Sequence, residues 1–106
     1  MALEVTDATF QAEVLQSDVP VLVDFWSQGC GPCLRMAPVI DELATENEGK
    51  AKVVKANVEN AMEMAGQYGI TMLPTLIVFK GGQPVDQTIG AQNKVALQAM
   101  IDEAIG

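Results

Sequence analysis

A nearly continuous apolar run, Val21-Leu22-Val23-Asp24-Phe25-Trp26, is the segment that most constrains the fold of this chain. It has the usual length of a β-strand, and only Asp24 interrupts it. Such a pattern is typical of a central strand in a parallel sheet, because helices cover both faces of that sheet. The run therefore predicts a layered α/β structure in which Asp24 is buried.

The only two cysteines follow this strand, at Cys30 and Cys33, in the sequence Cys-Gly-Pro-Cys. Pro32 fits the first turn of a helix, since its missing N–H is not needed there. Three apolar residues then follow at helical spacing: Met36, Ile40 and Leu43. A helix N-terminus presents unpaired N–H groups and a partial positive charge, which favour a thiolate on the first cysteine. Cys30 is therefore the candidate nucleophile.

Cys33 lies one turn into the predicted helix and is the candidate resolving cysteine, because it can attack a mixed disulfide at Cys30. A structural disulfide is one alternative, although a loop this short gains only about 2 kcal/mol in the chain-entropy model. A zinc site is another. Zinc takes four nitrogen or sulfur ligands, and the chain has no His and no further Cys, so only a dimer sharing two pairs could build that site. Redox chemistry is the leading interpretation.

Composition limits the partners and the compartment. Fourteen acidic and six basic residues give a net charge of −8, which argues against nucleic acid and anionic membrane surfaces and favours protein partners. The N-terminus lacks a basic and apolar leader, and no apolar run approaches the length of a membrane span. We expect a cytoplasmic protein, where a Cys-x-x-Cys pair is more often catalytic or metal-binding than structural. Its 106 residues leave room for one domain, 1–106.

The other elements follow from periodicity and from capping residues. Further strands are expected at residues 3–5, 52–58, 75–80 and 85–89. Helices are expected with Thr6 or Asp7 as N-cap, from Pro32 with a kink at Pro38, at 61–68, and after Asn93 as N-cap. Gly81 to Pro84 form a connection short enough for an antiparallel hairpin. The expected fold class is α/β, with parallel strands early and an antiparallel hairpin late.

Asp24 is the best candidate for proton transfer, because the chain has no His. Burial without a partner raises the pKa of a carboxyl group by destabilising its charged form. Such a group can exchange a proton with Cys33, which must be deprotonated to attack. Lys55, in the next strand, is a candidate electrostatic partner. The alternatives are an exposed carboxylate on an edge strand for Asp24 and a solvated lysine for Lys55.

Several motifs stand in the order and at the spacing of one known family. They are Val-Asp-Phe-Trp at 23–26, Cys-Gly-Pro-Cys at 30–33, Pro38, Pro74-Thr75 and Gly90. On these motifs the whole chain resembles the thioredoxin family. The resemblance implies a central five-stranded mixed β-sheet flanked by four α-helices. It also implies a protein disulfide reductase that needs no cofactor and no metal, and that cycles between a dithiol and a Cys30–Cys33 disulfide.

The resemblance also implies roles for individual residues. Cys30 is the attacking cysteine, Cys33 the resolving one and Asp24 the buried proton-transfer carboxylate. Pro74, for which a trans peptide bond is the default expectation, becomes a cis proline beside the disulfide. Trp26 is read first as a core aromatic and second as part of the site. The residues expected to bind partners are Trp26, Gly29, Gly31, Pro32, Val58, Met72, Leu73, Pro74, Ile89 and Gly90.

The implied partners are a flavoprotein thioredoxin reductase as donor and oxidised protein disulfides as acceptors, with the protein acting as a monomer. Two positions depart from the family pattern: Gly29 stands where a tryptophan is usual, and Leu34 where a lysine or arginine is usual. An aromatic ring and a basic group at these positions would shape docking, so the departures bear on partner choice. The alternatives are a dedicated electron donor to one oxidoreductase or stress enzyme with an atypical reductase, and a non-catalytic binding module.

Overall fold

The computed structural model describes residues 1–106 and contains one five-stranded mixed β-sheet. The strands are β1 (Leu3–Glu4), β2 (Val21–Trp26), β3 (Lys52–Asn57), β4 (Thr75–Lys80) and β5 (Gln83–Ile89). They lie in the order β1-β3-β2-β4-β5. Strands β1, β3 and β2 are parallel, whereas β4 is antiparallel to β2 and β5 is antiparallel to β4. The apolar run thus forms the central strand β2, as the sequence predicts.

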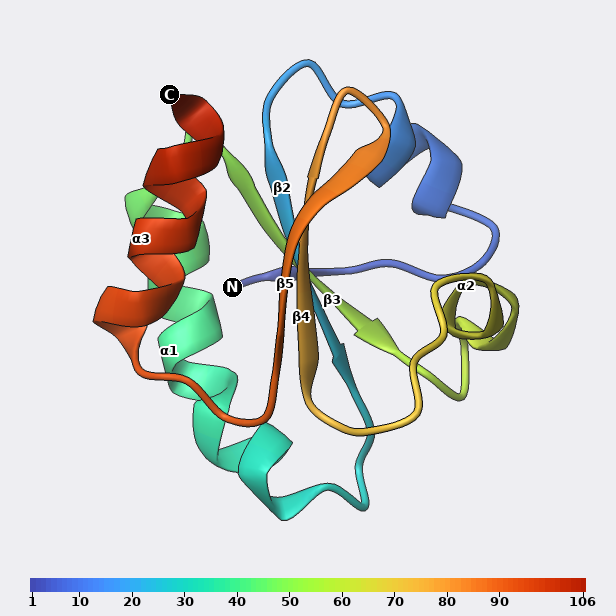
Figure 1. Ribbon diagram of the computed structural model, residues 1–106. Helices are drawn as coiled ribbons and strands as arrows, with labels where there is room; N and C mark the ends of the chain where they lie inside the picture. Colours follow the sequence, from blue (N-terminus) through green and yellow to red (C-terminus); the bar gives the residue numbers. More distant parts are fainter.

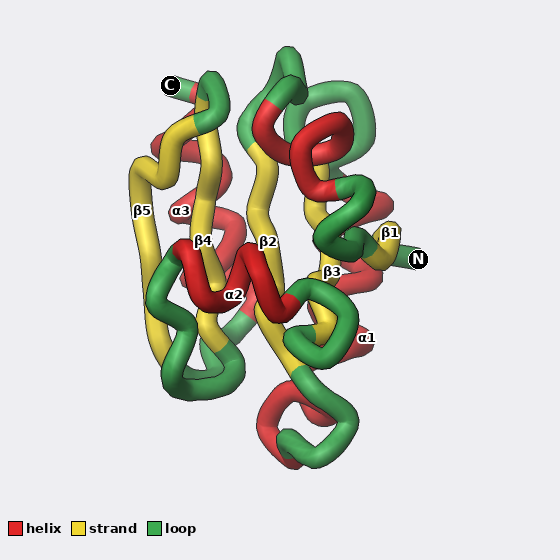
Figure 2. The backbone as a smooth tube through the Cα atoms, turned by 90° about the vertical axis from the view of Figure 1, so that its right-hand side faces the viewer, coloured by secondary structure: helices red, strands yellow, loops and turns green.

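Four helical segments cover the sheet. They are a short π-helix η1 (Gln11–Leu15), α1 (Gly31–Glu46), α2 (Met62–Gln67) and α3 (Lys94–Ile105). Helices α1 and α3 lie side by side against one face (Figure 1). The view in Figure 2 shows α2 in front of the sheet and α1 and α3 behind it. None of the helices has the length and apolarity needed to cross a membrane.

Side chains alternate along β2 and build a core on each face of the sheet. Leu22 packs with Ile40 of α1 and Leu97 of α3 on one face. Val23 and Phe25 pack in the cluster on the opposite face. Because successive residues of a strand point to opposite faces, Asp24 shares the α1 and α3 face with Leu22.

The predicted N-cap of the first helix is wrong, since neither Thr6 nor Asp7 caps η1 through its side chain. The carboxylate of Asp7 instead accepts hydrogen bonds from the N–H groups of Glu63 (3.1 Å) and Met64 (3.0 Å) at the start of α2. The N-cap of α2 is Ala61, which has no acceptor in its side chain. A carboxylate from a distant segment therefore satisfies the N–H groups that α2 leaves unpaired.

The remaining boundaries agree closely with the sequence. Asn93 caps α3, since its Oδ1 accepts a hydrogen bond from the N–H of Ala96 at 2.8 Å. The hairpin turns at Gly81 and Gly82, both with positive φ, and β5 begins two residues earlier than expected. Pro38 lies inside α1, which continues to Glu46.

Candidate active site

Strand pairing gathers the predicted site residues at one edge of the sheet. Trp26, the last residue of β2, is paired with Asn57, the last residue of β3. The next N–H group, that of Val58, donates to the carbonyl of Trp26 at 2.9 Å. Because β4 runs antiparallel to β2, its first residue, Thr75, pairs with Phe25. The loop that leads to the cysteines and the segment before Thr75 therefore leave the sheet at the same edge.

The same edge receives the end of β5. Ile89 pairs with Thr75, and the N–H of Gly90 donates to the carbonyl of Pro74 at 2.8 Å. Gly90 has a φ of 93°, a backbone conformation that favours glycine. The Leu73–Pro74 peptide bond is cis. The default trans expectation is therefore wrong, and the cis bond implied by the family resemblance is confirmed.

Cys30 and Cys33 form a disulfide at the N-terminus of α1, with 5.2 Å between their Cα atoms. Cys30 is the N-cap residue, and its Sγ accepts a hydrogen bond from the N–H of Cys33 at 3.1 Å. Cys30 is partly exposed, whereas Cys33 is only 2% exposed. Cys30 is therefore the more accessible of the two cysteines, and it lies at the helix terminus where N–H groups favour a negative charge.

Asp24 is 1% exposed, and its Oδ1 is buried without a hydrogen-bond partner. Desolvation raises the pKa of Asp24 from 3.8 to about 7; Lys55 partly opposes this increase, and the negative charge of Glu4 adds to it. The predicted burial is confirmed, and the alternative of an exposed carboxylate on an edge strand is wrong. At neutral pH this carboxyl group is poised to accept or release a proton.

Lys55 lies between two acidic residues in the sheet. It pairs in register with Asp24 of β2 and with Glu4 of β1. Its Nζ is 3.8 Å from Glu4 Oε2 and 4.5 Å from the centroid of a Trp26 ring. Glu4 Oε2 also accepts a hydrogen bond from Trp26 Nε1 at 3.1 Å. Glu4 was not predicted from the sequence, where its only local signal is an acid between the apolar residues Leu3 and Val5.

The surface beside the disulfide combines apolar side chains with one cation. Leu34, Met72 and Ile89 are about half exposed or more. A Cβ on Gly31 would lie 3.3 Å from Arg35 Nη1, so the guanidinium extends back over the glycine. Arg35 was not predicted from the sequence, although its place one turn after Gly31 was the available signal. Such a surface suits a docked polypeptide.

The predicted site residues thus fall into two layers. Cys30, Gly31, Pro74 and their neighbours form the edge, and Asp24 and Lys55 lie within the sheet behind it. No group of three or more His, Cys, Asp and Glu side chains is arranged to hold a metal ion.

Comparison with known proteins gives one consistent family. The Thioredoxin family model matches residues 1–103. Thioredoxin 1 of Nostoc sp. is 55% identical over 102 residues, which cover 96% of this chain and 95% of the relative. The thioredoxin of Chlorobaculum thiosulfatiphilum is 52% identical over 103 residues, covering 97% and 95%. The thioredoxin of Rickettsia felis is 47% identical over 105 residues, covering 99% and 100%.

Proposed function

The chain belongs to the thioredoxin family and is a protein disulfide reductase, and we propose that Cys30 is its nucleophile and Cys33 its resolving cysteine. The observation that carries this assignment is the contrast between the two sulfurs. Cys30 is the partly exposed N-cap of α1, and Cys33 is buried one turn later. Only the first is placed both to meet a partner and to be stabilised by the helix N-terminus.

The proposed reaction is two successive thiol–disulfide exchanges. The Cys30 thiolate attacks one sulfur of the target disulfide, so that a mixed disulfide forms and the second target sulfur leaves as a thiolate. The Cys33 thiolate then attacks Cys30 Sγ, which closes the Cys30–Cys33 disulfide and releases the first target sulfur. Two electrons pass to the target, whose two thiolates take up the two protons given up by the cysteines.

We assign to Asp24 the exchange of one of these protons with Cys33. A buried carboxyl group with a pKa of about 7 has both protonation states available at neutral pH, which suits a general acid or base. Its Oδ1 has no hydrogen-bond partner that would fix one of the two states. Lys55, its neighbour in register, moderates the charge of the ionised form.

Thioredoxin-family proteins are generally reduced by thioredoxin reductase and act on protein disulfides. We propose a flavoprotein reductase as the donor here, with the protein working as a monomer in the cytoplasm. Partners would bind over the edge described above: Trp26, Gly29, Gly31, Pro32, Val58, Met72, Leu73, Pro74, Ile89 and Gly90. A dedicated donor to one enzyme is the second candidate, and Gly29 and Leu34 favour it because they alter the docking surface.

Trapping tests the assignment of the two cysteines. In Cys33→Ser the mixed disulfide at Cys30 cannot be resolved, so covalent complexes with disulfide-containing proteins should accumulate. Cys30→Ser is the matched control and should trap none. Limiting alkylation of the reduced protein at neutral pH should label Cys30 first. Trapping by Cys30→Ser, or first labelling of Cys33, would reverse the two roles. Many trapped proteins would indicate a general reductase, and a single one a dedicated donor.

A further inference from the structure

Three charged side chains form a row across neighbouring strands. Glu4 of β1 and Asp24 of β2 are both paired in register with Lys55 of β3, which lies between them. Residues in register on adjacent strands point to the same face of a sheet. The row therefore consists of carboxylate, ammonium and carboxylate, and it runs from the outermost strand β1 to the buried central strand β2.

The contacts within this row are unequal. Lys55 forms its ion pair with Glu4, at 3.8 Å, although the Glu4 side chain is 46% exposed and that of Lys55 only 17%. Trp26 fixes the same Glu4 oxygen through its indole N–H at 3.1 Å and lies 4.5 Å from Lys55 Nζ. Asp24, by contrast, keeps Oδ1 unpartnered. The partly exposed acid, Glu4, rather than the buried one, Asp24, is the acid that pairs with the ammonium group of Lys55.

We propose that Glu4 is a positioning residue for Asp24: together with Trp26 it holds Lys55 as a shared counter-ion, so that the buried carboxyl group keeps its proton more readily. This inference rests on the proposed role of Asp24 in disulfide exchange. Glu4 acts through Lys55 and through its own negative charge, and it does not touch the sulfurs.

The surroundings of Asp24 leave few other charges to act on it. Lys55 from β3 and Glu4 from β1 are the charged groups that influence its ionisation. The buried residues on this face from α1 and β4 include Met36, Ile40 and Leu76, all uncharged. The further titratable group is the Cys33 thiol of α1, and it titrates only in the reduced protein. The oxidised protein therefore isolates the influence of Glu4 and Lys55.

Replacing the charge of Glu4 tests the inference. Glu4→Gln keeps a side-chain oxygen for the Trp26 N–H, and the single indole resonance of the chain reports whether that contact survives. Carbon-13 NMR of the oxidised protein should show the Asp24 titration moving to lower pH by about 0.6–1.2 units. That is the shift expected from a unit charge about 10 Å away, two strand spacings, at an effective dielectric of about 20–40. Glu103→Gln removes one negative charge from an exposed position on α3 and is the control; it should leave the Asp24 titration unchanged.

The pH profile of disulfide exchange separates the inference about Glu4 from the proposed role of Asp24, on which it rests. In Glu4→Gln the midpoint of the profile should move with Asp24, and in an Asp24→Asn background the same substitution should have no effect. An unmoved Asp24 titration in Glu4→Gln overturns the inference and leaves the role of Asp24 intact. A moved titration with an unchanged rate profile upholds the link from Glu4 to Asp24 and overturns the role of Asp24 in exchange.

Discussion

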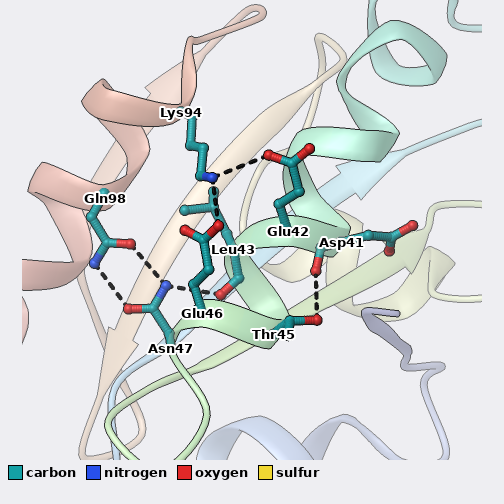
Figure 3. A network of polar contacts seen from close by, with 8 residues as sticks. All are labelled: Asp41, Glu42, Leu43, Thr45, Glu46, Asn47, Lys94 and Gln98. Atoms are coloured by element: carbon teal, nitrogen blue, oxygen red, sulfur yellow. Dashed lines mark hydrogen bonds and ion pairs between the residues drawn. The ribbon is translucent and has the colours of Figure 1, made fainter.

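Two buried polar side chains, one near each end of α1, differ in their hydrogen bonding. Beside its C-terminal end, Asn47 is 3% exposed and its amide is fully engaged. Its Nδ2 donates to the Leu43 carbonyl and to Gln98 Oε1, both at 2.8 Å, and its Oδ1 accepts from Gln98 Nε2 at 2.9 Å (Figure 3). Near the N-terminal end, Asp24 is equally buried and its Oδ1 has no partner.

The network around Asn47 fastens α3 to α1. Lys94 of α3 bridges two acids of α1, with Nζ 2.6 Å from Glu46 and 3.1 Å from Glu42 (Figure 3). Folded proteins pair nearly all their buried polar groups, and this end of the molecule follows the rule. The unpaired Asp24 Oδ1 is the exception to this rule, as we expect of a group with the proposed role in proton transfer. Asn47 therefore joins two helices through its hydrogen bonds, whereas no hydrogen bond satisfies Asp24 Oδ1.

Removing the amide of Asn47 should have a large effect on stability, because this group holds α3 against the C-terminal end of α1. We expect Asn47→Ala to lower the free energy of unfolding by about 1–3 kcal/mol, because it removes two hydrogen bonds to Gln98 and the side-chain hydrogen bond to the Leu43 carbonyl. Urea denaturation measures this change. The rate of disulfide exchange by the folded protein should stay at the wild-type value. A loss of disulfide exchange without a loss of stability would contradict this expectation, since it would give Asn47 a role in the reaction.

A smaller effect is expected at the docking surface. A Cβ added to Gly29 would meet nothing within 4 Å, and no positive φ restricts the position. We expect Gly29→Trp to lower KM with a thioredoxin reductase several-fold, equivalent to about 1 kcal/mol, because an aromatic ring adds a rigid apolar anchor. Steady-state kinetics measure it, and reduction by a small dithiol is the control. If KM stays the same or rises, Gly29 belongs to a surface matched to a different donor.

The sequence predicts much of the fold because the decisive signals are local. The apolar run of β2, the Pro32 at the start of α1 and the Asn93 cap each act within a few residues. Two of the errors concern contacts between distant segments. Asp7 caps α2 rather than the helix that follows it, and Glu4 reaches Lys55 only through the β1–β3 register. Neither partner is visible in a short window of sequence.

The candidate site likewise contains residues that a local sequence pattern predicts and residues that it does not. Helix and strand patterns place the cysteines at a helix N-terminus and bury Asp24, and the structure agrees. The cis bond at Pro74 has no local signal, so only the family resemblance predicts it. Arg35 was missed because its position over Gly31 depends on its side-chain conformation.

Burial of the ionised Asp24 carboxylate is unfavourable, and the pH dependence of the free energy of unfolding measures this cost directly. The folded pKa of about 7 for Asp24 lies above the ordinary 3.8, so the stability it provides is complete below about pH 4 and is lost as pH rises through 7. At 1.36 kcal/mol per pH unit, the ionised form costs up to roughly 4 kcal/mol. Unfolding free energies of wild type and Asp24→Asn should therefore be similar near pH 4 and diverge towards pH 8, with the variant more stable there. A difference that does not change with pH, or a variant that is less stable at pH 8, would show that burial does not raise the pKa of Asp24.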